Sequence, residues 1–483
     1  MLLNRTSLFP LPATGACSDR ALRRAAGLLA RPLLAAALIT LPVLAQGQTL
    51  ADEAVAWLQE FIRIDTINPP GNESRAVDFY SGIFDEEGIE WTAAESAPGR
   101  GNIWARLDGG DEPALVLLQH TDVVPADEKY WTTDPLSGEI RDGYIWGRGA
   151  IDMKGTGVSQ LATFLSLHRN GKPLNRDVIF VATADEEAGG LFGAGWLLEN
   201  RPEVFEGAGI LLNEGGSGRL SANGDTVFSV EVTQKVPVWL RMTAVDTPGH
   251  GSMPRPTSSV TRVVQAMELL RTNPFPARII GPVDAMFRSL AVSAEPAWAD
   301  SYADMGRAIR EPGFLARLQE HSVSLHALTR DTCSLTRMSG SNKINVVPPE
   351  AWAEVDCRIL PDRPVDDFVA RVRELVEPSG VDVEVIMAFS PAVTDTGTRL
   401  YSAIERITAE RHPGSRVMPS VSTGFTDSHF TRDAGIASYG FDPVIIPEAE
   451  LVRIHGNDER ISEAAFRRGV DDYRAIVESV VYD

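Results

Sequence analysis

The stretch "LVLLQHTDVVPA", Leu115–Ala126, decides the fold, because an apolar run ends abruptly in an imidazole and a carboxylate. The run reads as a buried strand, and His120, Thr121 and Asp122 follow it directly. A polar cluster placed at the carboxyl end of a buried strand is typical of a ligand crevice in an open α/β sheet.

Two further apolar runs are also followed directly by a cluster of polar residues. The three predicted strands are "ALVLLQ", "DVIFVATA" and "GAGILLN", and they end in His120-Thr121-Asp122, Asp185-Glu186-Glu187 and Glu214-Gly215-Gly216. If the strands are parallel, the three clusters converge on one edge of the sheet. Helical spacing occurs in "ADEAVAWLQEFIRI" and "SRAVDFYSGIFDEEG", and helical and strand patterns alternate along the chain from Leu50 to about Thr233. This pattern predicts an α/β catalytic domain, a mainly parallel sheet covered by helices.

A change of texture indicates a second domain inserted into the first. Between about 234 and 389 the pattern is strand-helix-strand-strand-helix-strand, with extra helical residues at 284–328. This order predicts an α+β sandwich. We therefore expect a catalytic domain at 50–233 and 390–483, which a chain of 483 residues is long enough to form, with the sandwich at 234–389 between its parts.

Charge and the first residues limit the partners and the location. The 45 Lys and Arg against 66 Asp and Glu give a net charge of −21, which argues against binding to nucleic acid or to anionic membranes. Basic residues precede "PLLAAALITLPVLA", which predicts a signal peptide at 1–45 and a periplasmic or secreted protein. The alternative is a membrane anchor, but the apolar run is shorter than the ~20 residues that a span requires.

Two cysteines, Cys333 and Cys357, follow the predicted signal peptide. In an oxidising compartment they can form a disulfide, and they can equally remain two buried thiols. The sequence does not fix their geometry, so both alternatives stay open.

The loops at the strand ends contain the side chains that bind metals. The candidate ligands are His120, Asp122, Asp152, Glu186, Glu187, Glu214 and His455. A nitrogen and oxygen donor set without thiolates suits zinc, cobalt or manganese. Each residue alone could be a polar group leaving the core or the solvated start of a helix. Three strands with the same ending favour a metal site.

Local context predicts different roles within this set. Asp122 is two residues from His120. Its carboxylate is therefore better placed to accept a hydrogen bond from the second ring nitrogen of His120 than to bind metal. Asp152 lies in "GRGAIDMKGTGVSQ", where it can reach two metals or cap the following helix, or do both. In the adjacent pair Glu186 and Glu187 the side chains diverge, and we assign Glu186 as the general base and Glu187 as a ligand.

These motifs resemble the dizinc metallopeptidases that include glutamate carboxypeptidase, aminoacylase-1, acetylornithine deacetylase and succinyl-diaminopimelate desuccinylase. The segments "HTDVVP", "GRGAIDMKG" and "ADEEAGGLFGA" are similar to the metal-binding segments of that family, while "GFTDSHF" and "IHGNDERIS" look most like its carboxypeptidase S and N-acyl-amino-acid hydrolase branch. The resemblance implies two divalent ions per chain, zinc above all. It implies one ion on His120, Asp152 and Glu214 and the other on Asp152, Glu187 and His455.

The resemblance also implies roles for the inserted domain as a lid and a dimerisation domain. In "TPGHGSMP" it implies that His250 reaches a substrate carbonyl, commonly across a homodimer. Asn345 and Arg358 match positions that recognise a substrate carboxylate, although Arg358 could instead form a surface salt bridge of little energetic value. Because they read as lying on neighbouring lid strands, we expect both to converge on one anion. Thr426 and Asp427 of "GFTDSHF" complete the substrate-binding residues that we expect.

The predicted function is therefore the hydrolysis of an amide bond in small N-acyl-amino acids or at the C-terminus of short peptides. Glu186 would take a proton from a water activated by the two ions and then pass it to the leaving amine. One alternative is a di- or tripeptidase that requires a free amino terminus. The resemblance argues against it, because related aminopeptidases tend to have Asp where this chain has Glu214. A secreted zinc-binding protein without activity is another alternative, and the intact Glu186 argues against that one.

Overall fold

In the computed structural model, which describes residues 49–221 and 224–482, β3 spans Glu112–His120 and lies inside the largest sheet. Leu115 and Leu117 pack into one apolar core, and Val116 and Leu118 pack into a second core on the other face. The strand is therefore buried on both faces, which explains why its apolar run is continuous rather than alternating.

The large sheet has eight strands and is mixed. The predicted strands lie in β3, β6 and β7, which run parallel to one another as expected, whereas β1–β2, β2–β6 and β7–β8 are antiparallel pairs. The strands, in spatial order, are β1 (Trp91–Glu95), β2 (Gly101–Leu107), β6 (Arg176–Thr183), β3, β7 (Ala208–Leu220), β16 (Ala437–Ile445), β8 (Thr226–Gln234) and β15 (Arg416–Ser422).

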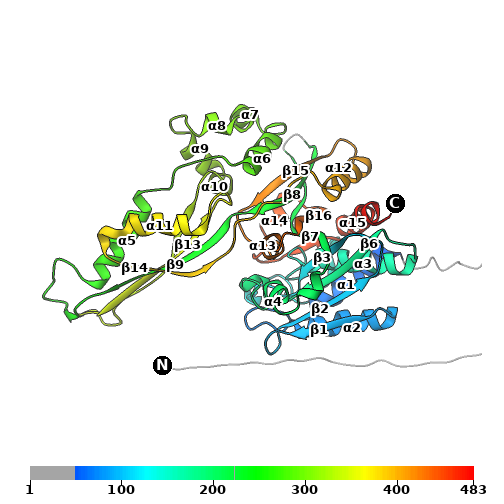
Figure 1. Cartoon of the computed structure of the whole chain (residues 1–483), viewed down its shortest axis with the longest axis horizontal. Coiled ribbons are helices and arrows are strands. Elements are labelled where there is room, and N and C mark those ends of the chain that lie inside the picture. The colour runs from blue at the N-terminus through cyan, green and yellow to red at the C-terminus, as the bar shows by residue number, and fades with distance from the viewer. Residues whose placement is uncertain (1–48, 222–223, 483) are drawn as a thin grey trace, which may run out of the picture. The chain divides into compact units, whose positions relative to one another are not determined.

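Helices cover both faces of this sheet (Figure 1). The first core contains residues of α1 (Leu50–Arg63), α2 (Ser74–Glu87), α3 (Lys154–Asn170), α12 (Arg399–Arg411) and α15 (Glu463–Val481). The second core contains Leu197 of α4 (Ala194–Asn200) and Phe205 of a 3₁₀ turn, Pro202–Phe205. The predicted α/β fold is confirmed, and every helix among the described residues is too short or too polar to cross a bilayer.

A separate four-stranded antiparallel sheet forms from the inserted residues. Its order is β11 (Thr332–Ser339), β13 (Glu350–Ile359), β9 (Val236–Val245) and β14 (Asp382–Ala388). The helices α5 (Ser259–Thr272) and α11 (Val365–Val376) share its apolar core and lie beside it in Figure 1. The element order matches the predicted strand-helix-strand-strand-helix-strand unit. The exact domain boundaries at 233/234 and 389/390 stay predictions, because Gln48–Asp483 forms one compact unit.

The extra residues of the insertion are helical, as expected. They form α6 (Gly281–Ala291), α7 (Pro296–Ala303), α8 (Met305–Ala308), α9 (Phe314–His321) and α10 (Val323–Ala327), which appear together in Figure 1. Val283, Phe287 and Tyr302 are among the residues that give this group its own apolar core. The group packs against the large sheet through α6 and β15.

Cys333 and Cys357 are direct cross-strand neighbours on β11 and β13 and form a disulfide. Of the two alternatives left open by the sequence, the structure has the disulfide. The signal peptide predicted at 1–45 lies outside the described residues.

Candidate metal centre and substrate site

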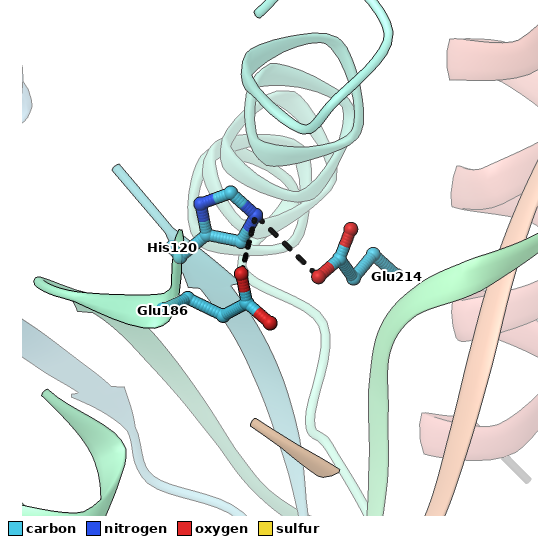
Figure 2. A group of neighbouring side chains, drawn as sticks. All are labelled: His120, Glu186 and Glu214. Carbon is cyan, nitrogen blue, oxygen red and sulfur yellow. Dashed lines mark ion pairs between the residues drawn. The ribbon is translucent and has the colours of Figure 1, made fainter. Parts of the chain in front are cut away.

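The polar residues that follow the three predicted apolar runs lie close together, but the third run does not end at Glu214, because β7 continues to Leu220. His120 is the last residue of β3, Glu186 begins a short 3₁₀ turn after β6, and Glu214 lies within β7. Figure 2 shows the Nε2 atom of His120 facing both carboxylates, 3.4 Å from Glu214 Oε1 and 3.8 Å from Glu186 Oε2. The parallel strands thus bring an imidazole and two carboxylates from distant parts of the chain to one point.

The other ring nitrogen of His120 fixes which atom can bind a cation. Nδ1 lies 3.0 Å from the backbone carbonyl oxygen of Asp122, and a carbonyl oxygen only accepts hydrogen bonds. Nδ1 therefore carries a proton, which leaves the lone pair of the neutral ring on Nε2. Nε2 is buried and has no hydrogen-bond partner among the described residues. The ring is oriented to present one free ligand atom to the acidic cluster.

Asp122 is buried between His120 and the loop that carries the two glutamates. Its carboxylate accepts hydrogen bonds from the backbone N–H groups of Glu186 and Glu187, both at 3.1 Å, and from Nδ2 of Asn68 at 2.8 Å. Oδ1 is also 3.4 Å from Nδ1 of His120. This carboxylate therefore positions other groups, as the sequence suggested, and its own oxygens are occupied by donors.

Asp152 is the residue that joins the two imidazoles. Its Oδ1 lies 3.3 Å from Nε2 of His120, and its Oδ2 lies 3.2 Å from Nε2 of His455. Glu187 approaches His455 from the other side, at 3.1 Å. The two oxygens of one carboxylate thus face two different imidazoles, so Asp152 connects the two histidines of the cluster.

These residues fit a divalent metal ion. The ligand atoms of His120, Asp152 and Glu187 lie within 4.8 Å of one another, and so do those of His120, Glu186 and Glu214. Both groups include His120 and neither equals a ligand set implied by the resemblance, so the division of the ligands between two ions stays a prediction. Besides Nε2 of His120, the buried Oε1 of Glu187 has no hydrogen-bond partner in the described part of the chain. Nitrogen and oxygen donors without sulfur suit zinc and similar ions.

The charges of the cluster also favour a metal site, because five carboxylates surround two imidazoles. Burial and the charge of Asp152 raise the pKa of Glu214 to about 8, and burial and Glu214 raise the pKa of Glu186 well above its usual range. Hydrogen bonds to Asp152 and Glu187 raise the pKa of His455 to about 10. Without cations the cluster must hold protons, and bound cations would take their place.

The role of Glu459 was missed at the level of sequence. It is fully buried, and its carboxylate accepts hydrogen bonds from Nη1 of Arg148 at 2.6 Å and from backbone N–H groups at Gly149, Ile151 and Asp152 at 2.8–3.2 Å. Arg148 also donates to the carbonyl of Gly456 at 2.7 Å. The pair therefore connects the loop of Asp152 to the loop of His455. The "DER" pattern of residues 458–460 resembles a solvated surface, so the sequence hides this contact.

A cavity of about 460 Å³ opens over the cluster. Asp152, Glu186, Glu187, Glu214 and His455 line it, together with Arg358 and Thr426. Nε and Nη2 of Arg358 pair with Asp356 at 2.7 and 3.2 Å, but its buried Nη1 has no partner among the described residues. Arg358 thus lines the cavity and pairs with Asp356, and one of its guanidinium nitrogens is buried without a partner among the described residues, which distinguishes it from a surface ion pair.

Asp427 does not line this cavity, in contrast to its predicted place among the substrate-binding residues. It precedes α13 (Ser428–Asp433) and is buried beneath the site, where Oγ1 of Thr183 donates to its carboxylate at 2.9 Å. Burial raises its pKa to about 7. The sequence placed Asp427 next to Thr426, but the start of a helix turns the two side chains to different surroundings.

His250 and Asn345 lie together, away from Arg358. His250 is in the two-residue strand β10 (Gly249–His250), which pairs with β12 (Val346–Val347), and the N–H of Gly251 donates to the carbonyl of Asn345. Arg358 is at the opposite end of β13 from Glu350, roughly 25 Å away at the usual rise of a strand. The expectation that Asn345 and Arg358 converge within one chain is wrong, because Asn345 belongs to the small β10–β12 ribbon.

Comparison with known proteins identifies the group to which this arrangement is related. A match to Peptidase family M20/M25/M40 covers residues 116–479. The N-fatty-acyl-amino acid synthase/hydrolase PM20D1 of Xenopus tropicalis is 31% identical over 382 residues, which cover 77% of this chain and 74% of that protein. Aminoacylase-1 of Homo sapiens is 27% identical over 434 residues, covering 88% and 94% of the two chains.

A solved structure extends the likeness to the fold. The M20 family metallo-carboxypeptidase Sso-CP2 from Sulfolobus solfataricus superposes with a TM-score of 0.68 at 18% identity, covering 88% of this chain and 99% of that one. At this identity the comparison supports the shared architecture alone.

Proposed function

This chain belongs to Peptidase family M20/M25/M40, and from that premise we propose that it is a two-metal hydrolase of N-acyl-amino acids. The observation that carries the proposal is the carboxylate of Asp152, which faces the imidazoles of His120 and His455 with its two oxygens. The relatives named for N-acyl-amino acid hydrolysis and for aminoacylase activity support the substrate class.

The guanidinium of Arg358 supports recognition of a free carboxylate. It is permanently charged, it lines the cavity that contains the candidate metal-binding side chains, and its buried Nη1 has no hydrogen-bond partner among the described residues. A substrate whose carboxylate binds Arg358 has its adjacent amide close to the acidic cluster. This arrangement favours removal of an acyl group from an amino acid, or of a C-terminal residue from a short peptide.

The chain's own residues supply the proton transfers. When bound, two divalent ions would lower the pKa of a water and polarise the amide carbonyl. Glu186 lies beside His120 and Glu214 and lines the cavity, so its carboxylate is placed to accept the proton of the attacking water. The same carboxyl group then donates that proton to the leaving amine. Asp122 holds the backbone of Glu186 in place through a hydrogen bond during both transfers.

A second copy of the chain would complete the site. His250 and Asn345 are exposed side chains at the end of the lid sheet that lies far from Arg358, so they do not reach the metal-binding side chains of their own chain along the sheet. The edge strand β11 carries Leu335 and Met338, whose exposed fractions are 51% and 48%. An apolar sheet edge of this kind suits pairing with another copy. We therefore include a homodimer in the proposal.

The test of the reaction compares substrates that differ at one end. The zinc-loaded protein should hydrolyse an N-acyl-L-amino acid. Most of this activity should be lost when the carboxylate of the substrate is amidated. Removal of the metal by a chelator should have the same effect. An unblocked dipeptide serves as the comparison substrate. Equal cleavage of the amidated compound, or an absolute need for a free amino terminus, would contradict the proposal and favour the peptidase alternative.

The homodimer is tested by mixing two inactive variants. A His250→Ala chain and a Glu186→Gln chain each lack one group, and a mixed dimer contains one site with both groups intact. Activity should return in part once the subunits exchange. Demonstrated mixed dimers without recovered activity would show that His250 does not act across the interface.

A further inference from the structure

A second cavity lies next to the catalytic cavity and shares a wall with it. It has a volume of about 580 Å³, and its lining includes residues of α6, α10, β7, β8 and β15. Gly215, Arg219 and Ser422 line both cavities. Gly215 directly follows Glu214, so this shared wall begins at the acidic cluster. A substrate held at the cluster can therefore extend into the second cavity.

The helix α6 contributes apolar side chains both to the core of the inserted helices and to the second cavity. Val283 and Phe287 are fully buried in that core. Met286 and Leu290 form another pair one turn apart, pack against the same core, remain partly exposed and line the second cavity. The cavity therefore has an apolar surface on the side of α6.

The rest of the cavity lining is also largely uncharged. Leu325 and Leu328 lie at α10, and Met418 and Val421 come from β15. Seven of the remaining lining residues are serines, which have small side chains. Arg219, His321 and Glu448 are the titratable side chains among the described residues that line it. Such a lining suits an uncharged chain better than a charged peptide segment.

We propose that this second cavity holds the acyl chain of the substrate, and that the enzyme prefers N-acyl-amino acids with medium or long aliphatic acyl groups. The inference rests on the proposed function. Arg358 lines only the catalytic cavity, so the carboxylate end of the substrate stays there and the acyl end is the part free to enter the neighbouring space. The inserted helices α6 and α10 then act as a specificity element for acyl length.

The expected signature is a rise in catalytic efficiency with chain length. Each methylene group that leaves water should increase kcat/KM by roughly three- to fourfold until the cavity is filled. The measurement uses acetyl, hexanoyl, decanoyl and lauroyl derivatives of one amino acid, chosen as the best acetylated substrate, each below its critical micelle concentration. A blocked tripeptide with the same C-terminal residue tests a peptide as the alternative occupant.

Variants that fill the cavity locate the effect. Leu290→Trp and Leu325→Trp place an indole in the cavity from α6 and from α10, and each should lower the lauroyl-to-acetyl ratio of kcat/KM by at least about tenfold. Val323→Trp is the matched control, because Val323 is also in α10 but is 70% exposed and does not line the cavity. Its ratio should equal that of the wild type. Using a ratio removes any general loss of folded protein.

The outcomes separate this inference from the proposed function. Hydrolysis of acetyl substrates without a gain for longer chains, or a ratio unchanged in both cavity-filling variants, would overturn the acyl subsite and leave the proposed function intact. A gain for the blocked tripeptide but not for lauroyl would also overturn it. If no N-acyl-amino acid is hydrolysed at any length, the proposed function fails and the subsite fails with it.

Discussion

Replacement of Asp122 by Asn tests whether the metal-binding residues depend on a carboxylate that does not itself face the cations. Oδ1 of Asp122 accepts from the N–H of Glu186 and lies near Nδ1 of His120, while Oδ2 accepts from Glu187 and Asn68. An amide has only one accepting oxygen. Whichever way the new side chain turns, its NH₂ group faces at least one N–H donor.

The least costly orientation keeps the oxygen at the Oδ2 position and loses the bond from Glu186. A hydrogen bond to a charged group contributes roughly 1.5–3 kcal/mol in a buried site. If loss of this hydrogen bond lets the metal ligands move, zinc binding should weaken by about 10- to 100-fold, the range found when groups that orient metal ligands are removed. The fold should remain, because the shape of the side chain is unchanged.

The assay is a zinc titration of metal-free Asp122→Asn against a chelating competitor, with circular dichroism as a check of folding. Asp177→Asn is the matched control, since Asp177 also accepts two hydrogen bonds but lies at the other end of β6. The control should bind zinc as the wild type does. An unchanged dissociation constant in the Asp122 variant would refute the positioning role.

Three other substitutions give independent tests. Glu186→Gln should retain its metals and lower kcat by roughly 10²- to 10⁴-fold, and near-normal turnover alongside metal analysis would remove Glu186 from the base role. His455 has a pKa of about 10 because of its two carboxylate neighbours, so its proton must leave before a metal binds. Apparent zinc affinity should therefore rise with pH between 6 and 8, by roughly tenfold per pH unit for each displaced proton. His455→Ala should reduce that slope. An identical slope in the variant would contradict the role of His455 as a metal ligand. Glu459→Gln leaves Arg148 buried without a charged partner and should cost about 3–5 kcal/mol of unfolding free energy, while adding Arg148→Met should recover part of the loss in chemical denaturation.

The sequence predicts best where secondary structure alone determines position. The run that ends at His120 reads as a buried strand, and parallel strands place their carboxyl ends at one edge of a sheet. His120, Glu186 and Glu214 could therefore be placed near one another before any coordinates were known. The disulfide between Cys333 and Cys357 could not be decided in the same way, because it depends on the register of β11 against β13.

Loops and long-range contacts were the features that the sequence did not reveal. Glu459 is buried only because the loop of Asp152 folds over it, and nothing in its neighbours along the chain indicates that burial. Asn345 was expected beside Arg358 because the two residues read as lying on neighbouring lid strands. The chain instead forms the β10–β12 ribbon with Asn345 next to it and then follows nearly the whole length of β13 before it reaches Arg358. Short strands of two residues have no periodicity from which to predict them.

The two histidines of the candidate metal site differ in burial and in the contacts that hold them in place. The side chain of His120 is 1% exposed at the end of a central strand, whereas that of His455 is 52% exposed on a loop. His120 is held by the sheet and by Asp122. The loop of His455 is held by the contact of Glu459 and Arg148, which joins the two loops across the site. Because a packed sheet permits less movement than paired loops, changes in the loop sequences should alter the position of His455 more than that of His120.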